Sequence, residues 1–241
     1  LAKMLITTRD ERGFHAYKPI GLTAFTEQEG KAYIKKSLAK SMYPPSEKEI
    51  TALIREVGLI PQKLSLAVAY ISEKQRLKPV QTYIDKLQTL KKADKKEASK
   101  VVLPEAHLGL ETLVDSLAKS QQVMHYGAYL DPDFIPLSLL SSLIGVSDEE
   151  ELEDILGALE RLSLISLIQG QEGKELGIQI HRQVQAACKN YTNWLGKSNI
   201  SEEGLLNSLL QALEKHMPQL SKVPDNSWKQ ATIYAPQVMH V

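Results

Sequence analysis

Residues 147–182 read SDEEELEDILGALERLSLISLIQGQEGKELGIQIHR, and the periodicity of this stretch changes from helical to extended about half-way along. Ser147 and Glu150 have the spacing of a capping box, in which a hydroxyl and a carboxylate bind the first free amides of a helix. Apolar residues then recur at helical spacing, at Leu152, Ile155, Leu156 and Leu159. The stretch therefore predicts a helix that begins beside Ser147 and buries this apolar stripe.

Two runs typical of strands follow, LISLIQ at 164–169 and LGIQIHR at 176–182. The residues that join them, GQEGKE, combine glycine with charge, which favours a β-hairpin. Before residue 147, a helix is expected from about Leu110 to HYGAYLDPDFIP, where Asp-Pro-Asp makes a turn, and IPLSLLSSLIG is expected to be a short apolar helix. Helix, helix, helix, hairpin, helix is the element order of a winged-helix domain.

The N-terminal part of the chain is predicted to contain four helices. Thr26 with Glu29, and Ser46 with Glu49, again have capping-box spacing, and Gly58 supplies a helix stop. Two further helices are expected, PQKLSLAVAYISEKQ and one from about Pro79 to Leu90. The lysine-rich stretch KKADKKEASK reads as a solvated linker, which places a domain boundary at about residue 102.

Composition limits the function classes. The 241 residues are 43% hydrophobic and 24% charged, which suits one large or two to three small globular units. Lys plus Arg equals Asp plus Glu, 29 each, so no net charge attracts nucleic acid or anionic lipid. Cys188 lies on an apolar helical face and is expected to be a buried structural thiol in a reducing, cytoplasmic compartment. No membrane span or signal peptide is recognisable.

Motifs for common catalytic chemistry are missing from the sequence. There is no G-x-x-x-x-G-K-[ST] phosphate loop, no paired cysteines for zinc, no H-E-x-x-H and no G-x-S-x-G, and the six histidines lack metal-ligand spacing. A winged helix also suggests DNA binding, but the helix before the hairpin carries seven acidic residues, Asp148, Glu149, Glu150, Glu151, Glu153, Asp154 and Glu160. Because DNA phosphates repel carboxylates, specific DNA binding is not expected.

Three short stretches remain, and each also has a plain structural explanation. KMLITTRD at the start reads as a buried strand, Met4–Thr8, that ends at Arg9, a residue that could be an ordinary surface charge. The Gly58-Leu59-Ile60-Pro61 turn could simply start a helix, and His181 in IQIHRQVQ could be a satisfied histidine under the wing. In this order, however, the three stretches resemble the C-terminal half of an NB-ARC module, the nucleotide-binding switch of the STAND class of signalling ATPases. The resemblance covers about residues 1–195.

The resemblance implies a mostly α-helical fold with four parts. Residues 1–25 would end a nucleotide-binding α/β domain, as the remnant of a parallel sheet whose other strands and phosphate loop precede Leu1. Residues 26–102 would form a four-helix bundle and residues 103–195 a winged-helix domain with its β-hairpin. The tail, 196–241, resembles the helical lead-in to tetratricopeptide repeats and would start a helical repeat array, with Leu205, Leu206, Leu209, Leu210 and Leu213 facing inward.

The resemblance also implies a site for ADP or ATP, with Mg in the full-length protein. Arg9 would reach the terminal phosphate of ATP, with Thr7 and Thr8 beside it. After Gly58, Pro61 or Ile60 would pack on adenine; the turn here is one residue longer than the family's Gly-Leu-Pro. His181 would donate to the β-phosphate of ADP, and Arg182 follows it where plant members have Asp.

As a whole, the protein would then be a cytoplasmic ADP/ATP-dependent switch that controls self-association and signalling. Its partners would be the preceding nucleotide-binding domain, further copies in the ATP state, and proteins bound by the helical repeats. Neither specific DNA nor a membrane is expected as a partner. The present chain alone is expected to be non-catalytic and to bind no nucleotide tightly. Two alternatives stay open: a non-catalytic helical scaffold that acts through protein contacts, and a winged-helix DNA-binding regulator.

Overall fold

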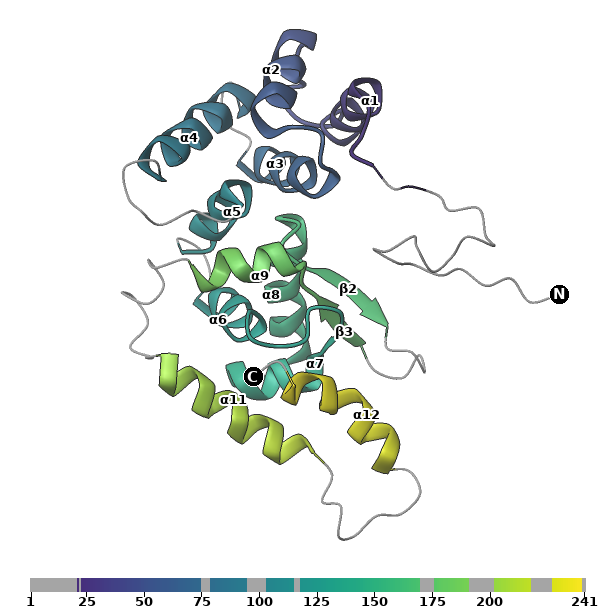
Figure 1. The fold of residues 1–241 in the computed structure, drawn as a ribbon, viewed down its shortest axis with the longest axis vertical. Coiled ribbons are helices and arrows are strands. Elements are labelled where there is room, and N and C mark those ends of the chain that lie inside the picture. Colours follow the sequence, from purple (N-terminus) through teal and green to yellow (C-terminus); the bar gives the residue numbers. More distant parts are fainter. Residues whose placement is uncertain are drawn as a thin grey trace, which may run out of the picture.

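The computed structural model describes residues 21, 23–74, 79–94, 103–114, 118–169, 176–190, 202–217 and 227–239. Within these ranges the chain is mostly helical, with a small three-stranded antiparallel sheet. Figure 1 shows the elements strung along one long axis, with α1–α4 at one end, α5 below them, and the sheet and the other helices towards the opposite end. The predicted strand Met4–Thr8 lies outside the described residues.

The first four helices are α1 (Glu27–Ser37), α2 (Glu47–Val57), α3 (Pro61–Lys74) and α4 (Pro79–Asp94). Both capping boxes predicted for these helices are confirmed: the hydroxyls of Thr26 and Ser46 accept from the N–H groups of Glu29 and Glu49, whose carboxylates accept in return. Each such cap stabilises a helix by about 1 kcal/mol. Gly58 ends α2 with φ 87°, a left-handed angle that favours glycine. We call residues 27–94 the helical lobe.

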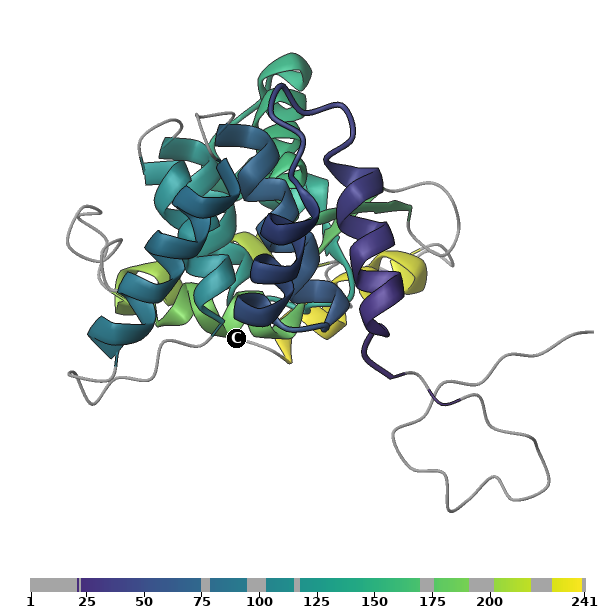
Figure 2. The ribbon, with the colours of Figure 1, turned by 90° about the horizontal axis from the view of Figure 1, so that it is seen from above.

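The helical lobe has its own apolar core. Its buried members come from all four helices and include Ile34, Leu53, Leu64 and Tyr83. The lobe forms because each helix carries an apolar stripe, as in α2, where Ile50, Leu53, Ile54 and Val57 are buried. Figure 2 looks down the long axis of the molecule on to these helices.

The rest of the described chain contains the sheet and seven helices. The helices are α5 (Pro104–Val114), α6 (Ala118–Gly127), α7 (Leu137–Ile144), α8 (Glu149–Arg161), α9 (Arg182–Lys189), α11 (Glu202–His216) and α12 (Ser227–Val238). The strands are β1 (Ile135–Pro136), β2 (Ser166–Gln169) and β3 (Leu176–Gln179). They form an antiparallel sheet in the order β1-β3-β2, with Ile178 opposite both Ile135 and Leu167. We call residues 118–239 the sheet lobe.

The local structure of the sheet lobe agrees with the sequence predictions in part. The antiparallel pairing of β2 with β3 is confirmed. The expected Ser147 cap of α8 is wrong by one residue, because Asp148 is the N-cap and its carboxylate accepts from the N–H of Glu151 at 3.2 Å. The single helix expected from about Leu110 is also wrong. It is two helices packed against each other, and the first begins at Pro104, whose fixed φ and missing N–H suit a first helical turn.

The cores of the two lobes meet where α3 and α4 pack against α5, which lies between the lobes in the chain. Leu66 of α3 packs with the core of the sheet lobe, and Leu108 of α5 packs with the core of the helical lobe. Other residues of α5, among them Leu110 and Leu113, belong to the sheet-lobe core. Helix α5 therefore links the two lobes, as its place in Figure 1 indicates.

The last helix, α12, is tied to the rest of the sheet lobe by part-buried polar contacts. The side-chain amide of Gln237 accepts from the N–H of Asp131 at 2.9 Å and donates to the carbonyl of Phe134. The hydroxyls of Tyr234 and Ser138 lie 2.7 Å apart. These bonds join α12 to α7 and to the turn before β1. Among the described helices, none is long and apolar enough to cross a membrane.

Candidate ligand groove between α3 and α9

A groove of about 760 Å³ opens where the first turn of α3 faces the end of α8 and the start of α9. Most of the side chains around it are polar. The lining residues are Gln62, Ser65, Pro132, Asp133, Glu160, Ser163, Leu164, Ile165, Ser166, Gln179, Ile180, His181, Arg182 and Gln183. The groove therefore takes one wall from the helical lobe and the other from the sheet lobe.

His181 lies directly before the first residue of α9, two residues after the end of β3. The inner positions of this segment, Ile178 and Ile180, are fully buried, while His181 is exposed and acts as the N-cap of α9. Its Nδ1 atom accepts a hydrogen bond from the N–H of Gln183 at 3.2 Å. Because Nδ1 acts as the acceptor, the ring proton of neutral His181 lies on Nε2. The other ring nitrogen is thus a hydrogen-bond donor.

The wall from the helical lobe begins at the predicted Gly58–Pro61 turn. Leu59 packs against the backbone of α1 at Gly30, where an added Cβ would lie 2.7 Å from the Leu59 Cδ2 atom, and its carbonyl accepts from Phe25 at 2.9 Å. This anchoring leaves Ile60 (48% exposed) and Pro61 open to solvent. The beginning of α3 then supplies the groove residues Gln62 and Ser65.

The predicted site residues are thus partly brought together. His181 lines the groove itself, whereas Ile60 and Pro61 directly precede its lining residue Gln62 and Gly58 ends α2. Thr7, Thr8 and Arg9 lie outside the described residues.

Two helices begin at the groove, and their first turns border it. The N-terminus of a helix carries a partial positive charge and unpaired N–H groups, so it favours anions. Ile60, which precedes α3, has no side-chain oxygen that could cap those groups. Arg182 adds a guanidinium, although it faces Asp133, whose carboxylate lies 3.7 Å away. Glu160 also lines the groove, so its charge is mixed.

The sequence alone did not identify the other polar residues that line the groove with His181. Gln62 and Ser65 are one helical turn apart, and this spacing after a helix-starting proline was the available signal for a polar face at the start of α3. Asp133 was recognised only as part of a turn. Its place beside Arg182 follows from the folding of the turn next to β3.

The acidic helix α8 is exposed along its polar face. The seven acidic residues between Asp148 and Glu160 are all solvent-exposed. One of them, Glu151, forms an ion pair with Lys119 of α6 at 3.0 Å. In the described ranges, no group of three or more His, Cys, Asp or Glu side chains could hold a metal ion. The groove is therefore taken as the candidate site, because it brings His181 together with polar residues of α3.

Cys188 on α9 is buried, as predicted. Burial raises the pKa of its thiol, so the thiolate that reacts with electrophiles is disfavoured. A structural role in the sheet-lobe core fits this environment.

No protein-family model matches the sequence, and no curated protein matches it either.

Proposed function

We propose that this chain is the helical part of an ADP/ATP-dependent molecular switch of the NB-ARC type, and that the groove forms one wall of its nucleotide site. The observation that carries the proposal is that His181 lines the same groove as Gln62 and Ser65, which lie just after Pro61 at the start of α3. The family resemblance assigns His181 to nucleotide, together with Ile60 and Pro61, which directly precede the groove residue Gln62. The meeting of these two segments at one groove supports a shared ligand.

The chemistry of His181 suits a phosphate oxygen. With Nδ1 engaged by Gln183, Nε2–H is the donor that remains for a ligand. A hydrogen bond from this group to an anionic phosphate is charge-assisted and contributes about 1.5–3 kcal/mol. The start of α9 and the guanidinium of Arg182 add favourable charge. Ile60 and Pro61, exposed at the start of α3, offer an apolar surface on which a base can stack.

The acidic groups of the groove explain why the chain alone should bind nucleotide weakly. Asp133 and Glu160 oppose an anion, and Thr7, Thr8 and Arg9 would need the preceding nucleotide-binding domain to complete the site. In this scheme ADP holds the sheet lobe through His181. Exchange to ATP, with Mg, moves the phosphate contact to Arg9 and frees the protein for self-association and signalling.

The arrangement of the sheet lobe supports its interpretation as a winged helix. Its elements run α6, β1, α7, α8, β2, β3, and the sheet order β1-β3-β2 places the hairpin beside the first strand. The helical lobe is interpreted as the bundle that precedes it. Helices α11 and α12 would begin a repeat array that binds protein partners in the cytoplasm.

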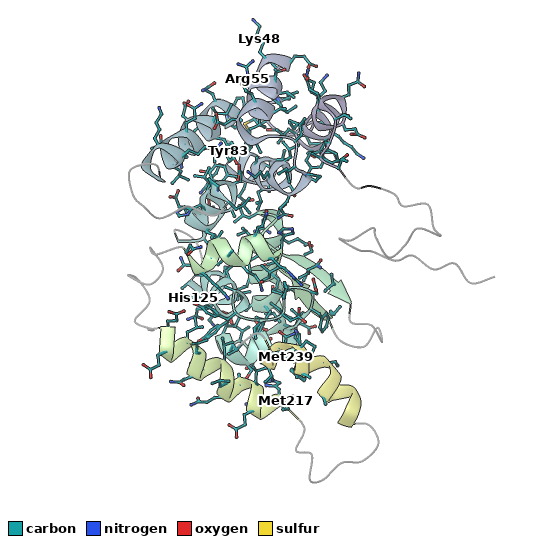
Figure 3. The ribbon with its side chains drawn as sticks, in the orientation of Figure 1. Lys48, Arg55, Tyr83, His125, Met217 and Met239 are labelled. Carbon is teal, nitrogen blue, oxygen red and sulfur yellow. The ribbon has the colours of Figure 1, made fainter. Side chains whose placement is uncertain are left out.

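The test is nucleotide affinity in a form of the protein that carries the proposed preceding nucleotide-binding domain. His181→Asn should weaken ADP binding by about tenfold, the loss of one charge-assisted hydrogen bond, and change ATP binding much less. Arg9→Ala should show the reverse preference. Arg55→Ala, on α2 at the far end of the helical lobe (Figure 3), is the matched control and should change neither. Equal losses for both nucleotides, or no binding at all, would favour the scaffold alternative.

A further inference from the structure

The contact of α3 and α4 with α5, which we call the seam, contains a buried carboxylate. Glu105, in the first turn of α5, is 1% exposed. Among the described residues it pairs with Lys63 of α3, whose Nζ lies 3.7 Å from Oε1, which is too long for a good hydrogen bond. Neither carboxylate oxygen has a hydrogen-bond partner among the described residues. The partial positive charge at the start of α5 offsets only part of the cost of burying this charge.

A second buried polar group lies at the same seam. The hydroxyl of Tyr83 on α4 (Figure 3) is buried and has no hydrogen-bond partner within the described ranges. Burial and, after it, the negative charge of Glu105 raise the pKa of Tyr83, so its phenol stays protonated. Buried groups that lack partners favour any arrangement in which water can reach them.

The backbone at the seam is strained as well. Leu103, which directly precedes α5, has φ 56°, an unfavourable angle for a residue with a branched side chain. Such strain persists only where the surrounding packing enforces it. Here Leu103 is itself buried in the sheet-lobe core, so packing holds it in this conformation.

Apolar packing opposes these unfavourable terms. Leu66 reaches from α3 into the sheet-lobe core, and Leu108 reaches from α5 into the helical-lobe core, both almost completely buried. Separating the lobes would expose these side chains to water. It would also hydrate Glu105 and Tyr83 and release Leu103.

We propose that the seam is a two-state hinge in which Glu105 drives opening, while Lys63 and the two packed leucines hold it closed. Lys63 is the neighbour of Gln62, so the same turn of α3 carries the closing charge and one wall of the groove. Opening the seam separates Gln62 and Ser65 from His181. The hinge does not depend on which ligand the groove takes, and its test uses none.

The two ends of the ion pair should act in opposite directions. Lys63→Met leaves the buried carboxylate uncompensated, so the open population should rise by about tenfold, a modest value because Lys63 is partly exposed. Glu105→Met removes the buried charge, so the open population should fall. The double variant should behave like Glu105→Met. An ordinary stabilising ion pair would instead make both single variants open the seam.

The distance between the lobes gives the readout. Spin labels at Lys48→Cys on α2 and Lys215→Cys on α11, both exposed and in different lobes, report opening as a longer distance in pulsed electron resonance. Figure 3 places Lys48 at the outer tip of the helical lobe. Hydrogen exchange of α5 amides, compared with those of α2 and α8, separates seam opening from global unfolding.

Two further variants complete the test. Lys91→Met breaks a pair within the helical lobe, where Nζ lies 2.7 Å from Glu56 Oε1, and should leave the distance distribution unchanged. Glu105→Gln, close in shape to the native residue, should also shift the seam towards the closed state if Glu105→Met does not fold. The inference would be overturned if the spin labels showed one distance that no variant changes, or if Glu105→Gln opened the seam. Either result would leave the nucleotide proposal intact.

Discussion

The Nδ1 atom of His181 accepts a hydrogen bond from the backbone N–H of Gln183, 3.2 Å away. The imidazole therefore caps α9, and His181 also lines the groove. A cap and a ligand contact predict different responses to substitution, which allows the two roles to be separated.

The capping role predicts that His181→Ala destabilises the chain, whereas His181→Asn does not. Asn keeps a side-chain oxygen that can accept from the start of α9, and losing a cap costs about 1 kcal/mol. Urea unfolding followed by circular dichroism measures the difference in the free energy of unfolding. Equal stability of the Ala variant and the wild type would show that the observed hydrogen bond contributes little.

Cys188 should be unreactive in the folded protein. Because burial raises the pKa of this thiol, little thiolate exists at pH 8 and reagent cannot reach it. A disulfide reagent should react with Cys188 only at the rate of local or global unfolding, and promptly in urea. The Lys48→Cys variant, with a thiol at an exposed position, is the control and should react at once. Rapid modification of native Cys188 would contradict its place in the core.

Two glycine substitutions should have opposite effects on stability. A Cβ at Gly177 would lie 2.8 Å from the carbonyl oxygen of Ile135 and 2.5 Å from the ring of Phe134, so Gly177→Ala forces β1 away from β3 and should cost about 1–3 kcal/mol. In α8, a Cβ at Gly157 meets only the guanidinium of Arg161 at 3.4 Å. Gly157→Ala should stabilise the chain by up to about 1 kcal/mol through helix propensity. Thermal unfolding of both variants measures the contrast.

The sheet lobe should not bind duplex DNA specifically. The exposed face of α8 carries its acidic residues, and phosphate repulsion outweighs contacts to base edges. Fluorescence anisotropy with duplex libraries at physiological salt should give no sequence-selective binding. A variant with Glu149, Glu150 and Glu153 changed to Gln tests the reason, since it should gain only weak, salt-sensitive binding. Sub-micromolar selective binding by the native chain would support the DNA-binding alternative.

Features of the candidate site differ in how far the sequence could predict them. His181 and the Gly58–Pro61 turn were identified from short motifs, because the residues of each motif are neighbours in the chain. Gln62 and Asp133 were not identified, because each borders the groove only after α3 and the turn before β1 have packed beside α9. The contact of Arg182 with Asp133 depends on the same packing.

The sequence by itself determined the local structure of this protein. Thr26, Ser46 and Gly58 set helix ends through hydrogen bonds and backbone angles that involve residues only a few positions away. Alternation and a glycine-containing joint were enough to predict the pairing of β2 with β3.

Tertiary structure alone decided the rest. Ile135–Pro136, expected to begin a helix, is strand β1 because β3 offers it a partner, and a two-residue strand has no periodicity to recognise. The buried charge of Glu105 and the groove beside His181 likewise arise where elements remote in sequence meet. Burial and charge pairing depend on which surfaces the packed helices bring together, and that information is not contained in the spacing of neighbouring residues.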